Sequence, residues 1–258
     1  MKTLKRILTK YEEFKKIKSY NLVDDLKTNE KIFKSLGFKI DKIKKNLNNL
    51  GLDYFDKQLS FHYHFFAGVK GKIKKNKKLN ILEIGTLDGN FTNFLSNLLP
   101  TSSITTIDLA DNDQNFKNTY HRDSALNLAR FLKKRKNNLK PSNIKFLKMH
   151  SVNLLKNFKK INFDYIFIDG DHQNPQVTID IIFAIMKVKK NGMILVDDVI
   201  KNLNFKKKEY VSADSFITLN HLEKLNIVNI KNLIKRIKEK NAIEKKFISI
   251  IKVLKKFS

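Results

Sequence analysis

Residues 80–90 read NILEIGTLDGN, and the pattern of this stretch decides the fold expected for the whole chain. The apolar run at residues 81–84 is short and rich in branched side chains, which favours a buried parallel strand over a helix. Gly85 and Gly89 bracket a turn, and apolar residues then recur at helical spacing through residues 91–99. The stretch therefore predicts a strand, a glycine turn and a helix.

The turn has the form Glu83-x-Gly85-x-x-x-Gly89, with Thr86 inside it, and lacks the three glycines of the dinucleotide fingerprint. A carboxylate at Glu83 suits a cationic amino-acid group and would repel a pyrophosphate. Asp108 ends the next predicted strand, where an acid can accept hydrogen bonds from both hydroxyls of a ribose. Together these residues predict a nucleoside ligand with a cationic amino-acid portion.

Further strands are predicted along the rest of the chain. Residues 143–150, NIKFLKMH, predict a third strand, residues 163–168 predict a fourth strand that is buried, and residues 191–199 predict the fifth. The β-rich runs at residues 227–237 and 246–253 flank a charged turn and predict a final antiparallel pair. Strands alternating with helices in this way indicate an α/β domain.

Carboxylates end two of these strands. Asp169 follows one, and Asp197 and Asp198 end the next. Adjacent parallel strands lie about 4.8 Å apart, so these side chains are expected to converge and to repel one another unless a cation binds. A hard divalent ion suits oxygen ligands, with Mg²⁺ first and Mn²⁺ or Ca²⁺ as alternatives. The competing interpretation is a group of acids paired with some of the many lysines.

Taken as a set, these motifs resemble known enzymes. Glu83, the glycine turn and Asp108 resemble the class I S-adenosylmethionine-dependent methyltransferases. The DGDH sequence at residues 169–172 and the VDDV sequence at residues 196–199 are similar to the metal-dependent O-methyltransferases, especially the branch that methylates sugars in macrolide and aminocoumarin antibiotics. The resemblance covers roughly Leu79 to Val253.

The resemblance implies an α/β, Rossmann-like, doubly wound fold with a mostly parallel seven-stranded sheet, an antiparallel C-terminal strand and an N-terminal helical extension. It implies that S-adenosylmethionine is bound by Glu83, Gly85, Thr86, Gly89, Asp108, Ser151 and Asp169, and that Mg²⁺ or another divalent cation is bound by Asp169, Asp197 and Asp198. The metal would lower the pKa of a substrate hydroxyl and aim its oxygen at the sulfonium methyl group. Asp171 is the favoured general base and His172 the second candidate.

One position departs from the family pattern. Related enzymes carry an acid and a serine after the third strand, where they contact the adenine. Here the matching residues are His150 and Ser151, so the serine is kept and the acid is absent.

Length and composition set the broad organisation. The 258 residues fit one methyltransferase domain, residues 70–258, preceded by a helical extension or cap at residues 1–69. Apolar residues recur at helical spacing in residues 4–17, which predicts a basic helix that packs on its own domain or on a partner subunit, with a membrane surface as the alternative. The absence of cysteine excludes disulfides and suits a cytoplasmic protein, and no run is long enough to predict a secretory signal or a membrane span.

The formal net charge of +27 leaves two interpretations open. The lysines are spread along the whole chain, which favours a compositional bias over a nucleic-acid or phospholipid surface. His62 and His64 lie in an aromatic segment before the first strand, where packing is favoured over a role as a base or substrate contact.

The leading hypothesis is a metal-dependent O-methyltransferase acting on a small hydroxylated molecule, a sugar or a glycosylated metabolite. The alternatives are a metal-independent methyltransferase acting on nitrogen or RNA and a non-catalytic basic binding module of the same fold. A homo-oligomer is compatible with each of them.

Overall fold

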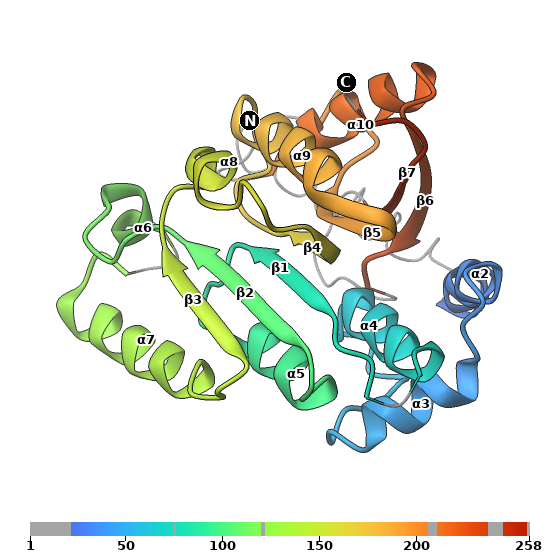
Figure 1. The fold of residues 1–258 in the computed structure, drawn as a ribbon, viewed down its shortest axis with the longest axis horizontal. Coiled ribbons are helices and arrows are strands. Elements are labelled where there is room, and N and C mark those ends of the chain that lie inside the picture. Colours follow the sequence, from blue (N-terminus) through green and yellow to red (C-terminus); the bar gives the residue numbers. More distant parts are fainter. Residues whose placement is uncertain (1–21, 75, 120–121, 206–210, 237–244, 257–258) are drawn as a thin grey trace, which may run out of the picture.

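The computed structural model describes residues 22–74, 76–119, 122–205, 211–236 and 245–256 (Figure 1). The helix predicted at residues 4–17 lies outside these ranges. The helices are α2 (Leu22–Ser35), α3 (Ile40–Asn48), α4 (Phe61–Lys72), α5 (Asn90–Leu98), α6 (Gln114–Asn118), α7 (Ala125–Asn138), the 3-10 helix η1 (Ser151–Asn153), α8 (Leu154–Asn157), α9 (Gln176–Lys187) and α10 (Asp214–Lys224). The strands are β1 (Asn80–Ile84), β2 (Ser103–Asp108), β3 (Ile144–Lys148), β4 (Phe163–Ile168), β5 (Val188–Val199), β6 (Val228–Ile234) and β7 (Phe247–Val253).

The seven strands form one sheet in the order β3-β2-β1-β4-β5-β7-β6. The pairs among β1 to β5 are parallel, whereas β7 runs antiparallel to both β5 and β6. The order reverses direction between β1 and β4, which is the switch point where doubly wound sheets bind ligands. The Rossmann-like, mostly parallel sheet with an antiparallel C-terminal strand is thus confirmed.

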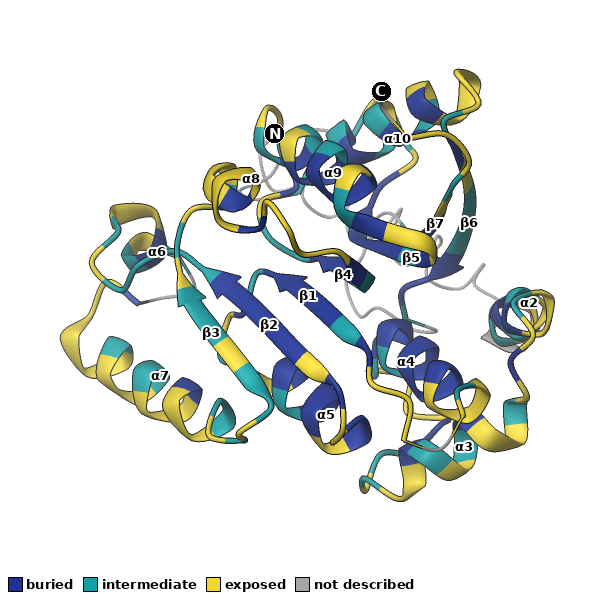
Figure 2. Ribbon diagram, viewed as in Figure 1, coloured by how far each residue is buried: buried dark blue, intermediate teal, exposed yellow. Residues whose placement is uncertain are grey.

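Helices cover both faces of the sheet, and strand alternation assigns each face its own core. In β1, Ile81 packs with the aromatic cluster of α2 to α5, whereas Leu82 and Ile84 pack with α8, α9 and α10. In β4, Phe167 belongs to the first cluster and Ile168 to the second. The central strands are buried on both sides (Figure 2), as their continuous apolar sequences predict.

The described N-terminal helices share their core with the sheet. Phe33 of α2, Ile43 of α3 and Phe65 of α4 lie in the same hydrophobic cluster as Ile81. Figure 1 shows α2, α3 and α4 together at one end of the molecule, beside the start of β1. The boundary proposed at residues 69 and 70 falls inside α4. None of the described helices is long and apolar enough to cross a membrane.

The carboxyl ends of the parallel strands meet at one edge of the sheet, and the candidate site residues lie along it. Ile84 of β1 pairs with Ile168 of β4, and Ile168 pairs with Val196 of β5. The residues that follow, Gly85, Asp169 and Asp197, therefore lie at one level. The segment that follows β2 contains the short helix α6.

Candidate active site

The turn after β1 is wound through backbone conformations that favour glycine. Gly85 has a φ of +100°, Leu87 of +50° and Gly89 of +75°, and Gly89 is the N-cap of α5. A Cβ added to Gly85 would lie 2.2 Å from the backbone oxygen of Asp169, so only glycine lets the ends of β1 and β4 approach this closely. Asn138 of α7 donates to the Asp88 carbonyl 2.8 Å away and braces the turn from outside.

Glu83 lies beneath this turn and is 2% exposed. The hydroxyls of Thr92 and Thr106 donate to its Oε2 at 2.5 and 2.6 Å, and the Thr86 hydroxyl lies 2.6 Å from that of Thr106. Burial raises the pKa of Glu83 to about 8, even though these hydrogen bonds favour the charged form. A cationic group arriving at this carboxyl would stabilise its ionised form.

Asp108 joins the end of β2 to the glycine turn. Its Oδ2 accepts from the Leu87 N–H at 2.9 Å, and its Oδ1 accepts from the Leu109 N–H at 2.8 Å. Burial raises the pKa of this carboxyl, while those N–H groups and the charge of Arg135 oppose the shift. Each carboxylate oxygen has a further lone pair, so Asp108 can still accept hydrogen bonds from two ribose hydroxyls while it bonds the two backbone N–H groups.

A polar group missed by the sequence analysis lies next to Ser151. Gln176 of α9 donates to Ser151 Oγ at 2.5 Å and to Asp180 Oδ1 at 2.8 Å. Asp180 is 1% exposed, and its Oδ2 has no hydrogen-bond partner among the described residues. Asp180 Oδ2 would lie 3.9 Å from a Cβ on Gly170, which places it beside the end of β4. An acid is thus present near Ser151, although His150 stands where the family carries one.

These features fit S-adenosylmethionine. Asp108 offers acceptors for a ribose, Glu83 suits a cationic amino group, and the buried Asp180 Oδ2 lacks a donor of the kind that an adenine amino group supplies.

The residues after β4 separate into two environments. Asp169 is 36% exposed at the sheet edge, and His172 Nε2 lies 3.5 Å from its Oδ1. Burial disfavours the charged form of His172, but the bond to Asp169 and the charge of Asp198 outweigh it and raise the His172 pKa. Asp171 is exposed, and its Oδ1 accepts from the Gln173 N–H at 3.0 Å. The structure therefore joins Asp169 with His172 and leaves Asp171 in a surface turn.

Asp197 and Asp198 are paired with lysines. The Lys235 Nζ lies 2.7 Å from Asp197 Oδ2 and 2.5 Å from Asp198 Oδ1, and Lys246 Nζ lies 3.0 Å from Asp198 Oδ2. Burial alone would raise the pKa of both carboxyls, but the Lys235 ammonium lowers it. Because Lys235 is 6% exposed, this contact is part of the protein interior.

The predicted ligand set of Asp169, Asp197 and Asp198 therefore does not fit a divalent ion in this structure. The described residues form no cluster of three or more His, Asp or Glu side chains able to hold a metal. The physical reason is that the Lys235 ammonium already bonds one oxygen of each aspartate, Asp197 Oδ2 and Asp198 Oδ1, and its positive charge would repel a metal ion there. Asp197 and Asp198 are instead paired with lysines, as the competing interpretation predicts.

Both histidines of α4 lie in the aromatic core, as the packing interpretation predicts. The His64 ring stacks on Phe61 at a centroid distance of 4.2 Å, and its Nε2 lies 2.9 Å from the Tyr54 carbonyl oxygen. The His62 ring contacts Phe91 and Phe167. Burial lowers the pKa of His62 to about 3, so its ring is neutral.

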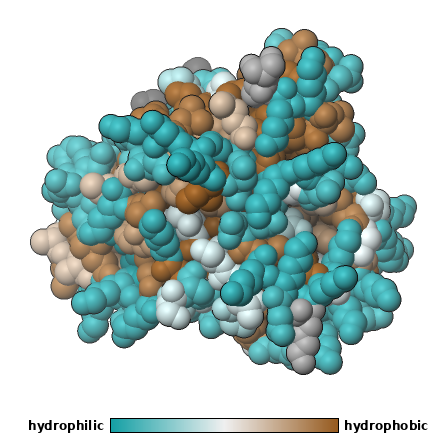
Figure 3. Space-filling view, in the orientation of Figure 1, coloured by the Kyte–Doolittle hydropathy of each residue, from teal (hydrophilic) through white to brown (hydrophobic). Residues whose placement is uncertain are grey.

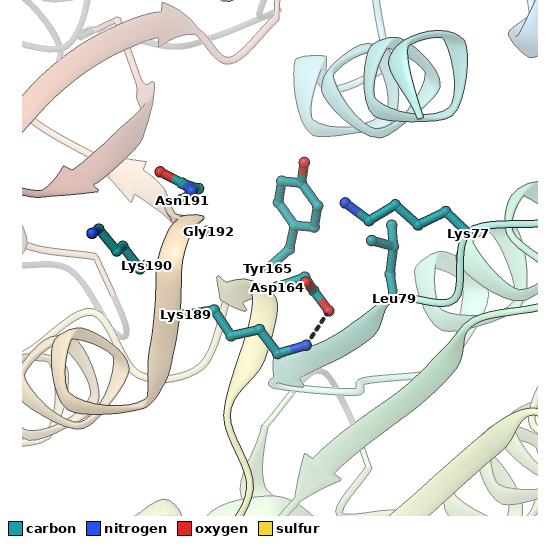
Figure 4. Close-up of a pocket in the computed structure, with 8 residues that line it drawn as sticks. All are labelled: Lys77, Leu79, Asp164, Tyr165, Lys189, Lys190, Asn191 and Gly192. Carbon is teal, nitrogen blue, oxygen red and sulfur yellow. Dashed lines mark hydrogen bonds and ion pairs between the residues drawn. The ribbon is translucent and has the colours of Figure 1, made fainter. Parts of the chain in front are cut away.

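A cavity of about 290 Å³ lies at the opposite edge of the sheet (Figure 4). The ring of Tyr165 stands between Lys77 and Asn191, and Lys189 is ion-paired with Asp164 at 2.8 Å. Asp164 and Tyr165 belong to the start of β4, so the cavity is separated from the candidate site by the length of that strand.

Sequence reasoning missed Asp180 and Lys235, and the two differ in how they could have been found. Asp180 is the one acid within the apolar sequence of α9, which is a usable signal. Lys235 is one of many lysines, and its partners lie 37 and 38 residues away in the sequence. No local pattern distinguishes it.

The comparisons agree with this fold. Residues 82–199 match a family model described as a methyltransferase domain. This match agrees with the prediction of a methyl-transferring enzyme. No curated protein sequence matches the chain.

Solved structures with this fold span different substrates. A presumed O-methyltransferase from Klebsiella pneumoniae is 17% identical, with a TM-score of 0.52 over 92% of this chain and 98% of that one. The O-methyltransferase TomG from Streptomyces achromogenes, involved in tomaymycin synthesis and solved with S-adenosylmethionine, is 16% identical, with a TM-score of 0.50 over 92% and 98%. A presumed rRNA methylase from Clostridium thermocellum is 11% identical, with a TM-score of 0.50 over 78% and 98%. At these identities the likeness establishes the fold alone.

Proposed function

We propose that this protein transfers the methyl group of S-adenosylmethionine to a hydroxyl oxygen of a small hydroxylated molecule. The observation that carries the proposal is the hydrogen bond from the Leu87 N–H to Asp108, which ties the glycine turn to the ribose-type acid. In the proposed complex the buried Glu83 would face the amino-acid end of the cofactor and the buried Asp180 its adenine end. The O-methyltransferases that share the fold support the choice of an oxygen acceptor.

S-adenosylmethionine supplies an electrophilic methyl group on a sulfonium when it is bound. The chain must hold the acceptor oxygen in line with that carbon–sulfur bond and take the proton of the hydroxyl. Asp169 is partly exposed at the sheet edge, and we assign it as the proton acceptor. His172 orients Asp169 through the contact of its Nε2 with Asp169 Oδ1. In the proposed reaction an oxygen–carbon bond would form as the carbon–sulfur bond breaks, the hydroxyl proton would pass to Asp169, and S-adenosylhomocysteine would be the product.

The sequence favours Asp171 as the general base, and replacing Asp171 distinguishes it from Asp169. Its carboxylate lies in an exposed turn, so its replacement by Asn is expected to leave activity nearly unchanged. A sugar or glycosylated metabolite remains the proposed acceptor class, on the resemblance of the DGDH and VDDV sequences.

Calorimetric titration of S-adenosylmethionine tests the proposal. The wild-type protein should bind saturably, and Asp108→Ala should weaken binding roughly tenfold or more, because two hydrogen bonds of about 1 kcal/mol each are lost. Asp113→Ala is the matched control, since Asp113 only caps α6. Absence of wild-type binding, or an Asp108→Ala variant that binds as well as Asp113→Ala, would contradict the proposal.

RNA methylation is the second candidate, and the net charge of +27 is the observation that favours it. Hydrophilic residues spread over the face seen in Figure 3, interrupted by hydrophobic patches, and do not gather into one stripe. If RNA is the acceptor, methyl transfer to polynucleotide should fall steeply with salt. Transfer to small hydroxylated acceptors that is insensitive to salt would favour the first candidate.

A further inference from the structure

The end of the β6–β7 hairpin brings positive charge to the site. Lys235 directly follows β6, and Lys246 directly precedes β7. Because β7 runs antiparallel to β5, with Phe247 opposite Val199, the start of β7 lies at the carboxyl end of β5. The Lys235 N–H donates to the Lys246 carbonyl at 2.9 Å, which holds the two residues side by side. The sheet topology thus places two lysines at the carboxyl edge of the parallel strands, where the aspartates lie.

A bulge in β5 allows Lys235 to contact both Asp197 and Asp198. Consecutive residues of a regular strand point to opposite faces, so Asp197 and Asp198 would diverge. The register of β5 and β7 shifts between Val196 and Val199, and Asp198 has a φ of +48°. This irregularity breaks the alternation, as bulges beside active sites commonly do. Lys235 consequently contacts both carboxylates.

We propose that the ammonium group of Lys235 takes the place of a divalent cation in this carboxylate group, so that the protein works without a bound metal. Lys235 and Lys246 together carry the charge of one divalent ion. Lys235 bonds Asp197 Oδ2 and Asp198 Oδ1, and Lys246 bonds Asp198 Oδ2. A metal would have to displace a buried ammonium from Asp197, which is itself fully buried. The inference rests on the proposed methyl transfer and says which groups neutralise the carboxylate charges of its site.

Lys235 can also act on the acceptor. An ammonium has three N–H donors, and the two aspartates take two of them. The third can donate to the oxygen of a hydroxyl placed beside Asp169 and stabilise the negative charge that develops there. In this arrangement Asp169 accepts the proton, while Asp197 and Asp198 position the ammonium.

The test measures Mn²⁺ binding by the loss of the free-ion electron paramagnetic resonance signal. The wild-type protein should show no saturable binding at Asp197 and Asp198. Lys235→Met removes the charge and keeps the side-chain length, so it should bind Mn²⁺ roughly tenfold more tightly or better, as expected when a like charge a few ångströms away is removed. Adding Asp197→Asn and Asp198→Asn should abolish the gain. Lys189→Met, which breaks an ion pair at the opposite edge, is the matched control and should gain nothing.

Two outcomes would overturn the proposal. The first is saturable Mn²⁺ binding by the wild-type protein that is lost in the Asp197→Asn, Asp198→Asn variant. The second is a folded Lys235→Met variant that gains no Mn²⁺ binding. If Lys235→Met is unfolded alone, recovery of its cooperative thermal transition on addition of Mn²⁺ supports the proposal, and failure to recover it counts against it.

Titration of S-adenosylmethionine into chelator-treated wild-type protein separates this inference from the proposed function. Absence of cofactor binding would contradict the methyltransferase proposal itself. Cofactor binding together with metal binding at Asp197 and Asp198 would contradict only the role of Lys235.

Discussion

Gly85 is the residue on which the approach of β1 and β4 most directly depends, and Gly85→Ala tests this. A Cβ at this position would lie 2.2 Å from the Asp169 oxygen, 2.6 Å from its carbonyl carbon and 2.9 Å from the Gly170 nitrogen. All three are backbone atoms, so no side chain can rotate away. The two strand ends must separate, and Asp169 must move with them.

The cost has two parts, and Gly51 isolates one of them. Gly51 has a φ of +72° and no atom within 4 Å of an added Cβ, so Gly51→Ala measures backbone strain alone. That strain is worth about 1–2 kcal/mol. Gly85→Ala adds overpacking of about 1–3 kcal/mol, for a total of roughly 2–5 kcal/mol. Its φ of +100° lies further from the region open to alanine, which places the expected value toward the upper end.

Urea unfolding followed by circular dichroism gives both free energies, and calorimetry gives the cofactor affinity of each folded variant. We expect Gly85→Ala to lose more stability than Gly51→Ala and to bind S-adenosylmethionine weakly or not at all, whereas Gly51→Ala binds normally. Equal destabilisation of the two variants, or unchanged cofactor binding by Gly85→Ala, would refute the argument from the close strand approach.

Three further predictions concern buried polar groups. Because burial raises the Glu83 pKa from 4.5 to about 8, the folded state keeps a proton between these pH values that the unfolded state has lost. The free energy of unfolding should therefore fall with rising pH in this range, by up to about 1.4 kcal/mol per pH unit. Urea titrations at several pH values should show this decrease in the wild-type protein and not in Glu83→Gln. Thr92→Val deletes the 2.5 Å bond to Glu83 and should cost about 1–3 kcal/mol in the same assay, whereas a cost near zero would argue against that bond. Asp180→Asn should weaken adenosine binding roughly fivefold to tenfold by calorimetry, and unchanged affinity would remove Asp180 from the adenine end.

The arrangement of the sheet follows closely from sequence patterns. The apolar runs around Ile81 and Ile166 are long enough only for buried strands, and each is followed by glycine or acid where a strand must end. Glu83, Gly85 and Asp108 could therefore be assigned to the carboxyl edge before the structure was known. Local periodicity carries this information because a strand buried on both faces has few alternatives.

The charge balance of the site was decided by tertiary structure. From the sequence, Asp197 and Asp198 look like metal ligands beside Asp169. The bulge in β5 and the antiparallel return of β7 instead bring Lys235 to both carboxylates. Asp180 is likewise linked to Ser151 through Gln176 only because α9 packs against the sheet and carries both residues to this position.

Sequence patterns alone were enough to locate the strands, the glycine turn and the acids at the strand ends, because those features depend on neighbours a few positions apart. The cation that neutralises those acids and the hydroxyls that bind Glu83 became evident from the packing of the folded chain. Such contacts join residues of different elements, and they depend on strand register and helix packing, which no local pattern records.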